Sequence, residues 1–148
     1  TTILYIGGMI LASYDASGSS NKGRKESFPK LYNWIGLLLI GMAMIFIVWV
    51  FRCNPYASRV VHVQPDQRLV TTGPYSIVRH PMYMAMIPAF CGLPLCVGSI
   101  AGISPMVICC VLVGIRTIDE ERFLVRTFGR KYQDYQNHVP YKMIPWVY

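Results

Sequence analysis

The chain has 148 residues, of which 53% are hydrophobic and only 14% are charged. A soluble domain of this length carries roughly a quarter charged residues, so the composition argues against a water-soluble fold and favours an integral membrane protein. Its 14 basic side chains against 7 acidic ones give a formal net charge of +7. Because Lys and Arg beside apolar segments normally face lipid phosphates, this excess indicates membrane lipids as partners and not a nucleic acid.

Two apolar segments open the chain, separated by a basic loop. Residues 1–14 contain no charge but are shorter than a membrane span, so they predict a truncated transmembrane helix. They lack the basic start and the cleavage site of a signal peptide. Residues 31–51 are also charge-free and meet the roughly 20-residue requirement of a bilayer. Trp34 and Trp49 lie near the ends of this segment like interfacial anchors, so we expect a full span over 31–51.

A third charge-free segment, residues 81–115, is too long for one helix. Turn-forming residues lie in its middle, namely Gly92, Pro94, Gly98 and Ser99, so it predicts a helical hairpin over 82–115. A buried hairpin in a soluble protein is the disfavoured alternative, because this short chain cannot bury three charge-free segments. The predicted fold class is therefore all-α. We expect a multi-spanning transmembrane helical bundle, a single domain over 1–148.

Basic residues predict the orientation of this bundle. With alternating spans, ten Lys and Arg fall within 52–80 and 116–148 on one face, against four in the loop 15–30. The positive-inside rule puts the ten-residue face, including the tail 116–148, in the cytosol. The hairpin would also bring residues 79–83 close to residues 116–121. The five cysteines show no paired or zinc-finger spacing, so we expect neither a disulfide framework nor a metal site.

The first polar cluster precedes the hairpin. Gly73-Pro74 is a turn signal, and Pro81 suits the first turn of a helix, where its missing N–H leaves nothing unsatisfied. Arg79 and His80 would then lie just before a helix N-terminus, whose amides favour anions. An ordinary membrane-edge anchor of Arg, His and Tyr is the alternative interpretation.

The second polar cluster follows the hairpin. Three consecutive acids, Asp119, Glu120 and Glu121, lie just beyond a charge-free segment. Ionisable groups at membrane depth are costly and indicate function. A helical staple between Arg116 and Glu120 is the alternative, but that order of charges contributes at most a few tenths of a kcal/mol. A carboxylate here could instead receive the ammonium or ribose hydroxyls of a cofactor.

The C-terminal tail combines an apolar stripe with a basic row. The stripe, at helical spacing, is Leu124, Phe128, Tyr132 and Tyr135. The row, with one residue every four, is Arg122, Arg126 and Arg130. This pattern predicts a cytosolic amphipathic helix that either lies on an anionic leaflet or packs against the cytosolic site.

These motifs together resemble a known family. They are Gly73-Pro74-Tyr75, Arg79-His80-Pro81-Met82-Tyr83, Glu120-Glu121, Phe128-Gly129-x-x-Tyr132-x-x-Tyr135, and the stretch from Val139-Pro140 to Ile144-Pro145. Over residues 52–148 the chain resembles the isoprenylcysteine carboxyl methyltransferases and the wider group of membrane methyltransferases, including phospholipid methyltransferases. The resemblance implies a cofactor pocket without a Rossmann domain, in agreement with the absence of Gly-x-Gly-x-x-Gly here.

The resemblance also implies site residues, by motif position. Those that would line the S-adenosylmethionine site are Tyr75, His80, Pro81, Met82, Tyr83 and Glu120. Those that would close it from the preceding loop are Gln64, Gln67, Arg68, Leu69 and Val70. The candidate catalytic residues are Arg116, which would face the methyl acceptor, Arg79 and Glu121. The prenylcysteine enzymes commonly have His at the position of Gln67, a departure that bears on the acceptor more than on the cofactor.

Methyl transfer from a sulfonium needs no acid, and a carboxylate acceptor needs no base. The protein's contribution to catalysis is therefore to position the reactants and to exclude water. Arg116 could hold the carboxylate of a lipidic acceptor, such as a prenylated cysteine, through a forked contact. A phospholipid amine or another small apolar acceptor is the alternative, and an amine would need His80 or Glu121 as base. Two other classes stay open: an NADPH-dependent membrane reductase that uses Arg68 and Arg79, and a non-catalytic membrane scaffold.

Overall fold

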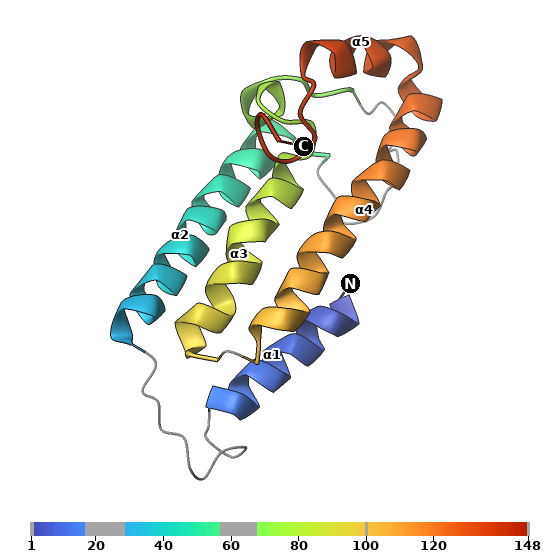
Figure 1. The fold of residues 1–148 in the computed structure, drawn as a ribbon. Helices are drawn as coiled ribbons and strands as arrows, with labels where there is room; N and C mark the ends of the chain where they lie inside the picture. The colour runs from blue at the N-terminus through green and yellow to red at the C-terminus, as the bar shows by residue number, and fades with distance from the viewer. Residues whose placement is uncertain (1, 17–28, 57–67, 100, 148) are drawn as a thin grey trace. The chain divides into compact units, whose positions relative to one another are not determined.

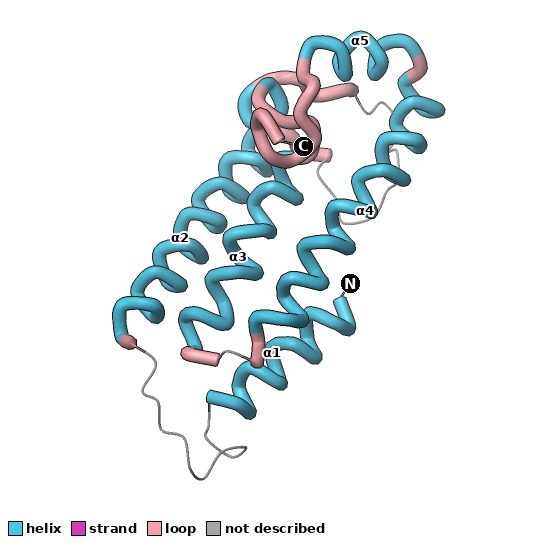
Figure 2. Tube along the Cα trace, in the orientation of Figure 1, coloured by secondary structure: helices cyan, strands magenta, loops and turns pink. Residues whose placement is uncertain are grey.

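The computed structural model describes residues 2–16, 29–56, 68–99 and 101–147. Helices dominate these residues, and none of them is in a strand (Figure 2), which confirms the all-α prediction. In chain order the elements are α1 (Thr2–Ala16), α2 (Lys30–Cys53), the short 3₁₀ helix η1 (Gly73–Ser76), α3 (Pro81–Val97), α4 (Ile103–Phe128) and α5 (Arg130–His138) (Figure 1).

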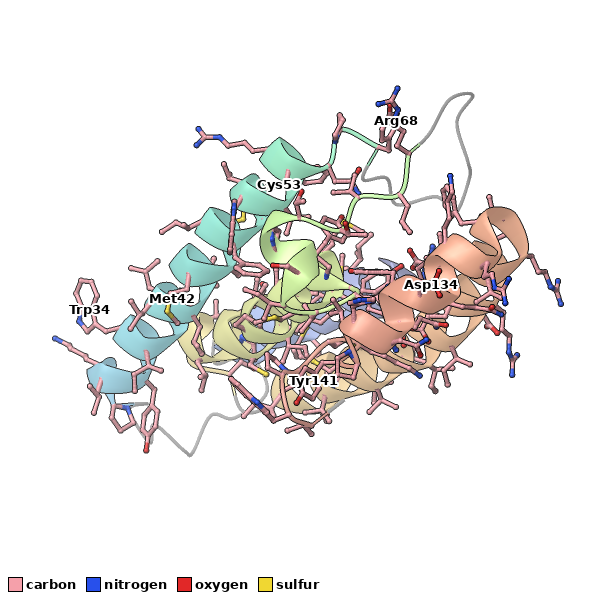
Figure 3. The ribbon with its side chains drawn as sticks, turned by 90° about the horizontal axis from the view of Figure 1, so that it is seen from above. Trp34, Met42, Cys53, Arg68, Asp134 and Tyr141 are labelled. Atoms are coloured by element: carbon pink, nitrogen blue, oxygen red, sulfur yellow. The ribbon has the colours of Figure 1, made fainter. Side chains whose placement is uncertain are left out.

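Helix α2 contains the predicted span 31–51. It has 24 residues, and within the described part of the chain it alone is both long and apolar enough to cross a membrane. Its apolar side chains face outward, with Trp34 68% and Ile45 75% exposed, and Trp34 projects away from the helix in Figure 3. An apolar surface of this kind is unfavourable in water and favourable in lipid. Helix α3 is apolar but has only 17 residues. That more than one helix crosses the membrane therefore stays a prediction.

Helices α3 and α4 form the predicted hairpin and turn at the predicted Gly98 and Ser99, but two other predicted turn residues and the hairpin's end were wrong. Gly92 and Pro94 lie inside α3, and the chain leaves the helix only at Gly98, which has a φ of +74°. Gly92 is a packing residue, because a Cβ there would lie 2.7 Å from the carbonyl oxygen of Gly36 on α2. Helix α4 also continues past residue 115 to Phe128, so the predicted tail begins as part of a helix.

The chain divides into two compact units. The first comprises Thr1–Met44 and Met86–Val113, and the second comprises Ile45–Ala85 and Gly114–Tyr148. In the first unit α2 and α3 approach closely at Gly36 and Gly92, and the Asn33 amide donates a hydrogen bond to the Cys96 carbonyl at 2.8 Å. The second unit contains both polar clusters that the sequence singles out.

The core of the second unit forms around α5. Tyr132, Tyr135 and Val139 are buried in one cluster, and the partly buried side chains packed against it are Leu69, Leu124, Val125 and Phe128. The predicted apolar stripe is therefore confirmed as packing. The prediction of a single amphipathic helix is wrong, because Gly129 separates α4 from α5. Gly129 has a φ of +57°, in the left-handed region that favours glycine. The predicted basic row remains exposed.

Candidate functional site

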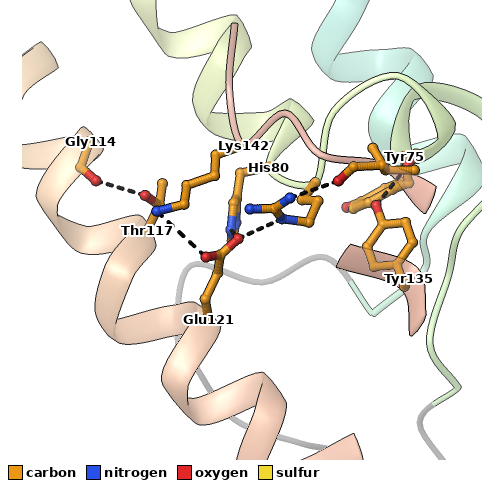
Figure 4. Close-up of polar contacts among 9 residues, drawn as sticks. Tyr75, His80, Gly114, Thr117, Glu121, Tyr135 and Lys142 are labelled. Carbon is orange, nitrogen blue, oxygen red and sulfur yellow. Dashed lines mark hydrogen bonds and ion pairs between the residues drawn. The ribbon is translucent and has the colours of Figure 1, made fainter. Parts of the chain in front are cut away.

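The Gly73-Pro74-Tyr75 turn forms η1 and fixes Tyr75. Gly73 has a φ of +63°, and a Cβ there would lie 2.6 Å from the sulfur of Cys53, so the turn requires glycine on both counts. The Tyr75 hydroxyl accepts a hydrogen bond from the Asn54 amide at 2.9 Å, and its carbonyl accepts one from the Tyr135 hydroxyl at 2.6 Å. Tyr75 therefore connects the end of α2 to α5, and Figure 4 shows its contact with Tyr135.

Arg79 and Glu121 form a buried ion pair at the start of α3. The Arg79 Nε lies 2.6 Å from Glu121 Oε1, and the two side chains are only 6% and 11% exposed. Burial by itself would raise the pKa of Glu121, but its contacts with His80 and Arg79 outweigh that effect and lower the pKa to about 2. Glu121 is therefore ionised over the whole physiological range, with its charge compensated inside the protein.

The same residues hold the C-terminal strap, which we define as residues 139–143. Arg79 Nη1 donates to the Val139 carbonyl at 2.7 Å, and the backbone N–H of Arg79 donates to the Tyr141 carbonyl at 3.0 Å. The His80 N–H donates to the Lys142 carbonyl at 2.8 Å, while the Lys142 ammonium lies 3.6 Å from Glu121 Oε2 (Figure 4). The strap is thus fastened to the Arg79-His80 segment by both backbone and side-chain contacts.

His80 and Tyr83 present their side chains beside this pair. Their rings stack with centroids 5.8 Å apart and an interplanar angle of 23°. His80 is 5% exposed, and its Nε2 lies 3.5 Å from Glu121 Oε1, too far for a good hydrogen bond. Within the described part of the chain this Nε2 has no hydrogen-bond partner.

Glu120 differs from its neighbour Glu121. Its Oε2 is buried and has no hydrogen-bond partner among the residues that the structure describes. Burial chiefly raises the pKa of Tyr75, and the Glu120 charge adds to the rise while the Asn54 hydrogen bond opposes it. Glu120 also interacts electrostatically with Tyr83, whose hydroxyl accepts a hydrogen bond from Arg116 Nε at 3.0 Å. The structure thus brings residues 79–83 and 116–121 together, as the sequence predicts.

The part of the chain that contains these residues is similar to known proteins. Positions 31–131, which include both polar clusters, match the phospholipid methyltransferase family. The chain belongs to this family. It is 34% identical over 110 residues to the methanethiol S-methyltransferase of Pseudomonas deceptionensis, a match that covers 72% of this chain and 41% of that protein.

Two metal-resistance proteins are further relatives. A cobalt-zinc-cadmium resistance protein of Cupriavidus metallidurans is 27% identical over 110 residues, covering 72% of this chain and 50% of that protein. A nickel-cobalt-cadmium resistance protein of Alcaligenes xylosoxydans xylosoxydans is 29% identical over 106 residues, a match that covers 72% of this chain and 46% of that protein. The chain therefore spans half or less of the length of these relatives. In the described ranges no group of three or more His, Cys, Asp or Glu could hold a metal ion.

The other site residues predicted from the family motifs lie in several environments. Pro81 is buried and Met82 half-buried at the start of α3, next to His80. Leu69 packs on the Tyr132 cluster, Val70 is half-buried, and Arg68 is exposed (Figure 3). Gln64 and Gln67 lie outside the described residues.

Sequence reasoning missed two contributors to the site. Lys142, a neighbour of Glu121, enters the sequence argument only as a positive charge of the tail. Asn54, the donor to Tyr75, carries no signal at all, since its position depends on where α2 ends.

Proposed function

We propose that this chain is an S-adenosylmethionine-dependent membrane methyltransferase whose cofactor site is centred on Glu120. The observation that carries the proposal is the buried Oε2 of Glu120, which has no hydrogen-bond partner among the described residues. A buried carboxylate oxygen without a partner is unfavourable unless a cation or a donor compensates it. S-adenosylmethionine offers such a cation, and membership of a methyltransferase family supports it as the ligand.

The residues around Glu120 fit this cofactor. The Tyr75, His80 and Tyr83 rings supply flat apolar surface, and Pro81 and Met82 supply apolar contacts beside them. Arg68, Leu69 and Val70, with Gln64 and Gln67, would close the site from the preceding loop. When bound, the cofactor supplies an electrophilic methyl group whose departure leaves a neutral thioether, so no protein acid is needed.

Arg79 and Glu121 act in this proposal as positioning residues. Both are buried and already contact groups of the chain itself. With a pKa of about 2, the Glu121 carboxylate is too weak a base to take a proton efficiently at neutral pH. Their role is to hold His80 and the C-terminal strap beside Glu120, so that the ligand meets a preformed site.

Arg116 is the residue that we assign to the acceptor. Its side chain is exposed, while its Nε hydrogen bond to Tyr83 ties it to the site. A guanidinium in this position can hold a carboxylate by two parallel hydrogen bonds, which favours a lipidic carboxylate such as a prenylated cysteine. We place this acceptor end at the cytosolic face of a multi-spanning bundle, with the hydrocarbon tail in the membrane.

A small thiol is the second candidate acceptor. It is favoured by the similarity to a methanethiol S-methyltransferase. A thiol must lose its proton before attack, so His80 would then be the candidate base. A phospholipid amine, which the family description suggests, would need a base in the same way. Arg116 separates the carboxylate from the thiol and the amine, since only the reacting group of a carboxylate offers two oxygens for its parallel hydrogen bonds.

Calorimetric titration of the detergent-purified protein tests the cofactor assignment. We expect S-adenosylmethionine and S-adenosylhomocysteine to bind with micromolar dissociation constants, and Glu120→Gln to abolish binding. Asp119→Asn is the matched control, because Asp119 precedes Glu120 but is exposed and pairs with the exposed Arg122 at 3.3 Å; it should bind normally. Binding of NADPH alone would indicate a reductase. Absence of binding by folded protein would refute the cofactor assignment.

A further inference from the structure

Two tyrosines of α5 differ in one respect that packing does not explain. Tyr132 and Tyr135 belong to the same buried cluster and are 1% and 6% exposed. The Tyr135 hydroxyl donates to the Tyr75 carbonyl at 2.6 Å. The Tyr132 hydroxyl is buried and has no hydrogen-bond partner within the described ranges. Because an unsatisfied buried hydroxyl destabilises a fold, a phenylalanine would serve the core better unless the hydroxyl meets a ligand.

Two other buried polar atoms of the second unit also lack a partner among the described residues. They are His80 Nε2 and Glu120 Oε2. His80 Nε2 lies 3.5 Å from Glu121 Oε1, and Tyr132 interacts electrostatically with both Glu121 and Glu120. The three unsatisfied atoms therefore belong to two side chains that interact with Glu121 and to its sequence neighbour Glu120, whereas the charge of Glu121 is compensated by Arg79 and Lys142. Because all three belong to residues that interact with or adjoin Glu121, one polar ligand could satisfy them together.

The hydrogen-bonding character of the three atoms defines that ligand. Burial chiefly raises the pKa of Tyr132, so its hydroxyl keeps its proton at neutral pH and can donate. His80 Nε2 donates when it carries the ring proton, and an ionised Glu120 carboxylate only accepts. Two donors beside one anionic acceptor match a zwitterion, in which a carboxylate takes the donors and an ammonium reaches the acceptor.

We propose that Tyr132, together with His80 and Glu120, binds the α-amino-acid end of the methyl donor, with Tyr132 and His80 on its carboxylate and Glu120 on its ammonium. This inference rests on the proposed function, which supplies a ligand that carries such a group. It adds Tyr132 to the residues that contact the cofactor. It also gives one member of the apolar stripe, Tyr132, a role in binding as well as in packing.

A pair of ligands that differ only in the carboxylate tests the inference by calorimetry. S-adenosylhomocysteine carries the complete zwitterion, whereas S-adenosyl-3-thiopropylamine keeps the adenosyl group and the ammonium but lacks the carboxylate. We expect Tyr132→Phe to weaken binding of the first about tenfold, the effect of one charge-assisted hydrogen bond. Binding of the second should change less than about twofold, because the lost hydroxyl has no carboxylate to meet.

Tyr135→Phe is the matched control. Its hydroxyl has a partner within the protein, so its loss should lower the melting temperature and affect both ligands alike. The melting temperature of ligand-free Tyr132→Phe should equal or exceed that of the wild type. Equal effects of Tyr132→Phe on both ligands, no effect on either, or a lowered melting temperature would overturn the role of Tyr132 while leaving the cofactor assignment intact. Failure of folded wild type to bind either ligand would overturn the proposed function itself.

Discussion

Replacement of Glu121 by glutamine tests whether the buried pair with Arg79 stabilises the second unit. Glutamine keeps the shape of the side chain and an acceptor oxygen but removes the charge, and the Arg79 cation, 6% exposed, is then left with neutral acceptors such as the Val139 carbonyl in place of a carboxylate. Removal of one member of a buried ion pair costs about 3–5 kcal/mol when nothing else compensates the other member. Because Arg79 retains neutral acceptors, we expect a loss below this range, at about 2 kcal/mol.

The lowered pKa gives a second route to the magnitude and predicts a pH dependence. The pKa of Glu121 is about 2 instead of its ordinary 4.5. This difference means that the ionised carboxylate stabilises the folded state by about 3 kcal/mol at neutral pH, or by about 2 kcal/mol after solvent screening. A carboxyl with a lowered folded-state pKa stabilises the protein above its unfolded-state pKa. This stabilisation is therefore complete above about pH 5 and is lost as the pH falls towards 2.

Thermal unfolding in detergent micelles, followed by circular dichroism from pH 6 to pH 2.5, measures both effects. At pH 6 Glu121→Gln should melt about 4–8 °C below the wild type, since about 2 kcal/mol shifts a chain of this size by that amount. The difference should shrink as the pH falls, because protonation removes the same charge from the wild type. Asp119→Asn, whose ion pair is exposed, should melt like the wild type throughout. Parallel curves for wild type and Glu121→Gln would refute the ion-pair reasoning.

Two further outcomes follow from the packing of α2 and from Arg116. Gly36→Ala should lower the melting temperature, because the added methyl group would lie 2.5 Å from the Gly92 carbonyl oxygen; Gly41→Ala on the same helix, with nothing within 4 Å, should not. Equal melting temperatures for the two variants would show that α2 and α3 do not pack as described. Arg116→Gln should raise the KM for a carboxylate acceptor about tenfold in a methyl-transfer assay, with binding of S-adenosylhomocysteine unchanged. A similar rise with a thiol acceptor would instead assign Arg116 to the general architecture of the site.

Charge-free runs predicted the helices well and their boundaries less well. The segment 31–51 is enclosed in α2 because nothing in it competes with helix formation in an apolar setting. The turn was predicted to begin too early because Gly92 and Pro94 are helix breakers in isolation, whereas Gly92 is needed where two backbones meet and Pro94 is tolerated inside α3. Such a role depends on the neighbouring helix, which a single segment of sequence does not reveal.

The site was predictable where its motifs lie close in sequence to the hairpin. Any hairpin over 82–115 brings its flanks together, which explains why Arg79 meets Glu121 in the structure. The contribution of the strap was not predictable in this way. Lys142 reaches Glu121 only because Gly129 breaks the helix and α5 returns the chain to η1, a path fixed by tertiary packing.

The two adjacent glutamates show most clearly what the sequence leaves open. Neighbouring positions on an α-helix point about 100° apart, so a Glu-Glu pair presents its two carboxylates to different surroundings. Glu121 faces Arg79 and Lys142, and its charge is satisfied within the protein. Glu120 has a buried oxygen that no described residue satisfies. One acid therefore stabilises the site, and we infer that the other meets the ligand. If so, Glu121→Gln should impair folding before binding, and Glu120→Gln should impair binding without loss of stability.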